Sequence, residues 1–191
     1  MSKGRLEAFS DGVFAILITI LVLELKLPHG DDWQALRPMA VIFGTYVLSF
    51  VFLGIYWNNH HHMLHAATRI NGRILWANLH LLFWLSLVPF TTAWMGESHV
   101  APFPTAIYGV VLLCAGVGYL ILERALIAVE GANSKLAEAV GRDVKANVSA
   151  LLYAAAIGLA FVRGWIAIAI YFSVAVMWLV PDRRIEARLR E

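Results

Sequence analysis

The hydrophobic and polar positions along the chain form long apolar segments separated by short polar stretches. Six apolar segments approach the length of about 20 residues that a helix needs to cross the hydrocarbon core of a bilayer. Only Arg163 and Gly164 separate the last two segments, which predicts a tight antiparallel hairpin there. We therefore expect one six-helix transmembrane domain over residues 1–191, with helices at about 8–27, 39–66, 74–95, 105–129, 147–162 and 165–180.

The composition indicates an all-α membrane protein. Of the 191 residues, 60% are hydrophobic and only 15% are charged, whereas about 25% are charged in a typical soluble domain. The net charge of +2 gives no support to a nucleic-acid partner. The single cysteine, Cys114, can form neither an internal disulfide nor a thiolate metal cluster.

The basic residues predict the orientation in the membrane. If both termini are cytoplasmic, 12 of the 15 Lys and Arg residues lie on the inner side, and only Lys26, Arg37 and Arg163 lie outside. This imbalance agrees with the positive-inside rule. Four acids would lie at the outer surface, either concentrating cations modestly or serving only as solvated loop charges: Glu24, Asp31, Asp32 and Glu97.

Several polar side chains lie inside the apolar segments, all near the inner membrane surface in this topology. Asp11 lies in the first helix, the histidines at 60–62 at the inner end of the second, and Asn78 in the third. Because buried ionisable groups are tolerated in lipid when they are paired, we expect Asp11 to pair with Arg5 or a histidine of the second helix. The candidate set, called here the inner polar layer, is either a structural clamp between helices or a proton-sensitive, ion-contacting layer: Arg5, Ser10, Asp11, His60, His61 and Asn78.

Two further interpretations rest on the histidines. His61 and His65 have the i, i+4 spacing of a helix-borne metal site, but no acid or thiolate of defined geometry accompanies them. His61 and His80, on neighbouring helices, are of the residue type that binds haem iron axially. The sequence has no serine elbow, HExxH motif or glycine-rich phosphate loop, so we expect no enzyme, no cofactor and no metal site.

Residues 116–120 contain the V-G-Y of the potassium-channel filter sequence T-V-G-Y-G, without its leading Thr and closing Gly. They lie within an uninterrupted apolar segment, where the carbonyl groups are used by the helix itself rather than offered to an ion. We interpret the match as a coincidence.

The first helix carries an apolar stripe. Ile16, Ile20, Leu23 and Leu27 follow the spacing i, i+4, i+7, i+11, and Thr19 lies on the same side of the helix. Periodicity alone does not distinguish a stripe in the protein core from one in contact with lipid, and it indicates no pore.

Three sequence motifs resemble the transmembrane protein 175 family of potassium channels. Residues 5–12 (R-L-E-A-F-S-D-G) are similar to the R-x-x-x-F-S-D signature that opens the first helix of the family. Residues 56–61 (Y-W-N-N-H-H) are similar to its second motif, and Asn78, with residues 87–91 and 96–97, fits its third helix. The resemblance covers about the first 100 residues and identifies the chain as a bacterial member with one six-helix unit.

The resemblance implies a homotetramer in the bacterial plasma membrane, with a central pore for monovalent cations, K⁺ above all, lined by four copies of the first helix. The family has no filter loop and narrows the pore with apolar side chains. By offset from Asp11, the constricting rings would be Ile16, Ile20 and Leu23, with hydroxyls from Thr19.

The resemblance also implies that Arg5, Ser10 and Asp11 join a second-helix histidine and Asn78 in a clamp that orients the first helix. The run of three histidines leaves open which one takes part. Lys26 is unexpected beside a cation pathway, and it either extends away from the pore or pairs with Glu24 or an acidic loop residue. The alternatives are a proton or metal-ion transporter that uses the histidines, and a haem-binding membrane protein.

Overall fold

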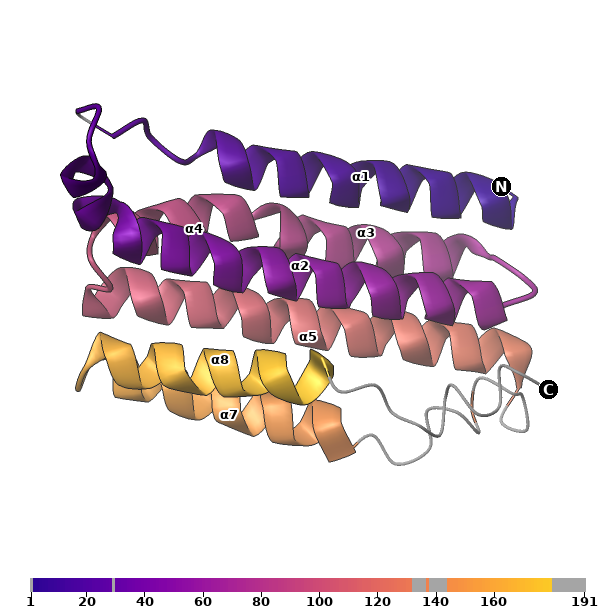
Figure 1. The fold of residues 1–191 in the computed structure, drawn as a ribbon. Helices are drawn as coiled ribbons and strands as arrows, with labels where there is room; N and C mark the ends of the chain where they lie inside the picture. Colours follow the sequence, from indigo (N-terminus) through magenta and orange to yellow (C-terminus); the bar gives the residue numbers. More distant parts are fainter. Residues whose placement is uncertain (1, 29, 132–136, 138–143, 180–191) are drawn as a thin grey trace.

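The computed structural model describes residues 2–28, 30–131, 137 and 144–179. These residues form helices and connecting loops, which confirms the all-α fold class. In chain order the elements are α1 (Lys3–Leu23), the 3₁₀ helix η1 (Trp33–Met39), α2 (Ala40–Ala66), α3 (Gly72–Ser86), α4 (Val88–Glu97), α5 (Pro102–Glu130), α7 (Val144–Ala160) and α8 (Gly164–Leu179). Figure 1 shows an elongated bundle with α1 along one edge and α7 and α8 along the opposite edge.

Several of the described helices are long enough to cross a membrane. Within the described residues, four helical stretches are long and apolar enough to span a bilayer, namely α1, η1 with α2, α3 with α4, and α5. α7 and α8 are apolar but shorter, with 17 and 16 residues. At about 1.5 Å per residue they reach about 25 Å, near the lower limit for a spanning helix. Val180 of the sixth predicted helix, and the basic residues at 135, 142 and 183–190, lie outside the described residues.

The bounds of α1 differ from the predicted 8–27. The helix begins at Lys3, whose ammonium lies 3.7 Å from the Glu7 carboxylate one turn later. It ends at Leu23 rather than Leu27. Pro28 disfavours the helical conformation in the residue before it, and Lys26 turns toward Glu97 at the C-terminal end of α4.

The third apolar segment is broken rather than continuous. α3 ends at Ser86 and α4 begins at Val88, with Leu87 as the cap of both helices. Pro89 has no N–H to donate to the carbonyl one turn earlier, and its ring crowds that carbonyl, so the helix is interrupted where the proline enters.

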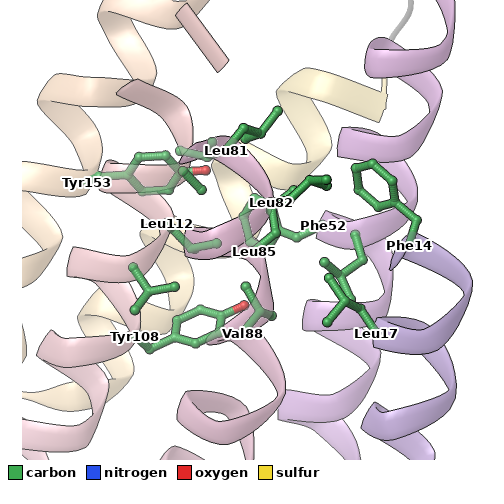
Figure 2. Packing of buried hydrophobic residues seen from close by; sticks show 14 of the residues in the cluster. Phe14, Leu17, Phe52, Leu81, Leu82, Leu85, Val88, Tyr108, Leu112 and Tyr153 are labelled. Carbon is green, nitrogen blue, oxygen red and sulfur yellow. The ribbon is translucent and has the colours of Figure 1, made fainter. Parts of the chain in front are cut away.

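One side of α1 packs against α2, α3 and α4. Its buried residues follow helical spacing, Leu6, Ser10, Phe14, Leu17 and Leu21. In Figure 2, Phe14 and Leu17 lie beside Phe52 of α2. From there the core continues through Leu82 and Leu85 of α3 to Tyr108 and Leu112 of α5.

Two glycines allow close packing on the opposite side of the bundle. Gly164, the first residue of α8, lies against the backbone carbonyl of Val100, where a Cβ has no room. Gly109 of α5 lies against the hydroxyl of Tyr171, which donates to the carbonyl of Thr105 at 3.0 Å. The predicted antiparallel hairpin of α7 and α8 is therefore seated tightly on α5 and on the loop that precedes it.

Candidate functional site: the inner polar layer and the outward face of α1

Three polar side chains from three helices meet inside the bundle. Asn78 Nδ2 of α3 donates to Ser10 Oγ of α1 at 3.0 Å, and His60 Nε2 of α2 lies 2.7 Å from Asn78 Oδ1. All three residues are buried, with at most 1% of their surface exposed. An amide oxygen can only accept, so the His60 Nε2 carries the hydrogen in this bond. We call these residues the α1 network, because they connect α1 to the helices behind it.

Helical periodicity positions each member of the α1 network. Ser10 lies one turn before Phe14 on the buried face of α1, and the Phe14 ring packs on the His60 ring with centroids 5.5 Å apart. His60 lies on the buried face of α2 with Met63 and Leu64. The structure therefore places His60 in the network, and it leaves His61 and His62 exposed.

The partner of Asp11 differs from the expected one. Its Oδ1 accepts a hydrogen bond from the Trp57 indole Nε1 of α2 at 3.0 Å, and no described ion pair joins it to Arg5 or a histidine. Arg5 precedes Asp11 by six residues, which places the two about 120° apart around the helix. Asp11 meets Trp57 on the exposed side of α2 instead.

The inner polar layer is thus only partly assembled within the chain. Ser10, His60 and Asn78 form one network, and Asp11 lies next to it with Trp57. Arg5 and His61 are exposed, although the His61 ring contacts the Trp57 ring with centroids 6.1 Å apart. Sequence reasoning did not select Trp57. Its indole N–H, which requires an acceptor in an apolar segment, is a signal that identifies it.

The proposed constriction residues lie on the side of α1 that faces away from the bundle. Ile16 is 58% exposed and Leu23 is 78% exposed. Thr19 is also exposed, and its hydroxyl donates to the carbonyls of Ala15 and Ile16 of its own helix at 2.6 and 3.0 Å. Ile20 is half-buried, because it lies between this face and the packed one.

The chain that follows the C-terminal end of α1 makes an ion pair. Lys26 Nζ lies 2.6 Å from Glu97 Oε1 at the end of α4. Of the two expectations for Lys26, the structure selects pairing with an acid, and the partner is Glu97 rather than Glu24. Asp32 also has a local role, since its Oδ1 accepts from the Ala35 N–H at 3.0 Å and caps η1.

The histidine rings are arranged along α2 rather than between helices. The His61 ring contacts the rings of Trp57, His62 and His65. The His80 ring contacts Trp84 of its own helix, so the described ring contacts do not pair His61 with His80 as axial haem ligation requires. Among the described residues, no group of three or more His, Cys, Asp or Glu side chains is placed to hold a metal ion.

Comparison with known proteins connects this geometry to a family. The family model described as endosomal/lysosomal potassium channel TMEM175 matches residues 5–89, which include the α1 network and the whole of α1 after Gly4. A protein of Chryseobacterium sp. (strain P1-3), named a potassium channel, is 53% identical over 191 residues, covering 100% of both chains. The chain belongs to the TMEM175 family.

Two further TMEM175 family members extend the comparison. The crystal structure of a lysosomal potassium-selective channel TMEM175 homolog from Chamaesiphon minutus matches with a TM-score of 0.75 and 26% identity, covering 93% of this chain and 96% of that one. The Homo sapiens endosomal/lysosomal proton channel TMEM175 is 38% identical over 87 residues, which is 38% of this chain and 17% of that protein. With its apolar helices, this chain is a multi-pass protein of the bacterial plasma membrane.

Proposed function

We propose that four copies of this chain form a potassium-permeable cation channel, with both termini in the cytoplasm and one copy of α1 from each subunit lining the pore. The observation that carries the proposal is the asymmetry of α1. Its buried face contributes Ser10 to the α1 network, while Ile16, Thr19 and Leu23 lie on a face that none of the described residues covers. The assignment of K⁺ as the permeant ion is supported by a relative that matches over the full chain length and is named a potassium channel.

An apolar constriction explains how such a pore closes. Four copies of Ile16 around the axis form the innermost ring, with Ile20 and Leu23 at successive turns toward the outside. A narrow apolar ring offers no polar partner to a cation losing its water, so it conducts poorly until it widens. Thr19, between these rings, supplies the hydroxyl oxygens nearest to the constriction.

The pore needs no filter loop. Residues 116–119, which contain the V-G-Y sequence, lie within the continuous helix α5, where backbone carbonyls accept the helix's own hydrogen bonds. Selectivity in this proposal therefore depends on the width and the side chains of α1.

The α1 network fixes the rotational position of α1 about its own axis. A rotation of about 100° would exchange Ile16 for Leu17 at the pore axis and would carry Ser10 away from Asn78. The two buried hydrogen bonds oppose that rotation, because a polar group without a partner is costly in a membrane. We assign Ser10, His60 and Asn78 this positioning role.

The test is Ile16→Asn in protein reconstituted into liposomes, with K⁺, Na⁺ and H⁺ fluxes measured separately. An amide at the narrowest ring admits water and offers dipoles to the ion, so total flux rises and the preference for K⁺ over Na⁺ falls. Ile16→Met, which keeps the ring apolar, stays restrictive.

The matched control is Leu17→Asn. Leu17 is the next residue along α1 but is only 4% exposed and packs in the core. The same substitution there lowers stability without raising flux. Unchanged flux in well-folded Ile16→Asn protein would show that α1 does not line the pore, and its exposed face would then be a surface for lipid.

A further inference from the structure

His61 and His65 form a pair on the exposed side of the last two turns of α2. Their rings lie nearly parallel, at 17°, with centroids 6.1 Å apart. Both side chains are exposed, so their rings turn without disturbing the core. Residues four apart on a helix lie on the same side, one turn above each other, which lets two imidazoles bind one ion.

We propose that His61 and His65 bind one divalent transition-metal ion per chain, of the Zn²⁺, Ni²⁺ and Cu²⁺ class. Imidazole nitrogen suits these ions, whereas Ca²⁺ and Mg²⁺ prefer oxygen ligands. Each ring supplies one nitrogen, at about 2.0–2.1 Å for zinc, and water completes the coordination because the site faces solvent. The sequence shows only the spacing, and the structure adds that both side chains are exposed, so each ring can rotate from the stacked arrangement to direct a nitrogen at the shared ion.

The charged groups around the pair permit a bound cation. The Lys3 ammonium donates to the backbone carbonyl of His65 at 2.8 Å, and it also lies 3.7 Å from the Glu7 carboxylate, which offsets its charge. On the other side, the Trp57 ring lies beside His61 and donates to Asp11. The acids Glu7 and Asp11 therefore bring negative charge to this end of the bundle.

The same contacts connect the metal pair to α1. Lys3 of α1 donates to the backbone carbonyl of His65. Asp11 of α1 accepts from Trp57, whose ring lies beside the His61 ring. An ion that joins two turns of α2 resists fraying of this helix end and holds Trp57 in place against Asp11. This consequence rests on the proposed function: if α1 lines the pore, metal at the inner surface restrains the lining helix and lowers flux.

The binding test uses the purified full-length protein, with any affinity tag removed, titrated with Zn²⁺ by calorimetry. Wild-type protein binds one ion per chain. His65→Ala weakens binding by at least about tenfold, since even loss of an outer-shell partner typically weakens a metal site by that factor. Electron paramagnetic resonance with Cu²⁺ shows two coordinating nitrogens in wild type and fewer in His65→Ala.

The matched control is His62→Ala, which removes an exposed histidine next to the pair and leaves both proposed ligands. Its Zn²⁺ affinity stays within about twofold of wild type, because His62 meets the His61 ring only edge-on and supplies no ligand of its own. Wild-type affinity in His65→Ala overturns the site. A loss in His62→Ala as large as in His65→Ala overturns the assignment to His61 and His65.

The flux test separates the metal site from the channel. Zn²⁺ on the side of the chain termini lowers K⁺ flux in wild-type liposomes and has no such effect on His65→Ala. If Zn²⁺ binds to the wild-type protein and the K⁺ flux does not change, the proposal that the metal restrains α1 is overturned. Absence of any K⁺ flux overturns the proposed function, and the calorimetric result on the site stands separately.

Discussion

Two buried polar networks among the described residues differ in which helices they join. The α1 network joins α1 to α2 and α3. The second, called here the scaffold network, joins α2, α4 and α5 through Ser49, Thr92 and Tyr108. Thr92 Oγ1 donates to Ser49 Oγ at 2.7 Å, and Ser49 Oγ lies 2.9 Å from the Tyr108 hydroxyl. Only the first network holds the helix that we propose to line the pore.

The two networks also differ in how they depend on single residues. In the α1 network, Asn78 makes both bonds, so its loss leaves Ser10 and His60 without this partner. In the scaffold network the hydroxyl of Thr92 lies 2.7 Å from the Val88 carbonyl as well as from Ser49, so Thr92 keeps a partner when Ser49 changes. The attachment of α1 is therefore the more fragile of the two, and substitutions test this difference directly.

The largest expected effect is that of Asn78→Leu. It removes both bonds of the α1 network and leaves two buried polar groups unpaired, each at a cost of about 1–3 kcal/mol. We expect a large drop in the thermal unfolding temperature in detergent and loss of assembled protein on size exclusion. Asn58→Leu, at an exposed position of α2, is the control and retains near-normal stability. Equal behaviour of the two variants would contradict the role given to Asn78.

The next effect is that of Gly164→Ala, on the side of the bundle away from α1. The new Cβ collides with the Val100 carbonyl, so the hairpin must shift. Overpacking of this kind costs about 1–3 kcal/mol. Thermal unfolding measures the loss, and ion preference in the surviving channels stays unchanged because α1 is not touched. Gly158→Ala, where a Cβ meets open space, is the control. A fully stable Gly164→Ala protein would refute the close approach.

A smaller effect is expected for Tyr108→Phe in the scaffold network. It removes one hydroxyl, while Ser49 keeps its bond from Thr92. Hydrogen bonds between membrane helices contribute about 0.6 kcal/mol on average, so unfolding shifts slightly and flux per folded protein stays normal. Tyr46→Phe, at a half-buried position of α2, is the reference. A change in K⁺ preference in Tyr108→Phe would show that the scaffold network also positions α1.

The smallest effect concerns Asp11 and Trp57, whose bond is exposed. A double-mutant cycle of Asp11→Ala and Trp57→Phe isolates their coupling, which we expect to be below about 1 kcal/mol. Asp11→Ala should weaken folding or assembly more than it alters ion selectivity. A stable Asp11→Ala channel with altered selectivity would place this carboxylate in the ion pathway.

The sequence predicts the fold well because membrane crossing demands long apolar runs. The ends of these runs are less certain, since capping and proline effects act over a few residues. Pro89 is visible in the sequence, yet the helix was expected to continue through it. Likewise, α1 stops at Leu23 because the chain there turns Lys26 toward Glu97, a partner distant in sequence.

The sequence predicts the level in the membrane at which the site residues lie, but not how each helix is rotated about its own axis. Topology alone places Ser10, the histidines and Asn78 in one layer, and the structure joins Ser10 and Asn78 there. The choice of His60 follows from the rotation of α2, which its buried positions Leu53, Met63 and Leu64 already indicate by helical spacing. The partner of Asp11 depends on how α1 and α2 are set against each other, and hydropathy carries no information about that.

The break at Leu87 has a mechanical consequence for α1. In its N-terminal half α1 is bonded through Ser10 to Asn78 of α3, and beyond its C-terminal end Lys26 pairs with Glu97 of α4. The two attachment points therefore belong to separate rigid helices that meet at a proline joint. Any bending at that joint changes the span between the attachments, so α1 must tilt, stretch the segment between Leu23 and Lys26, or release one end.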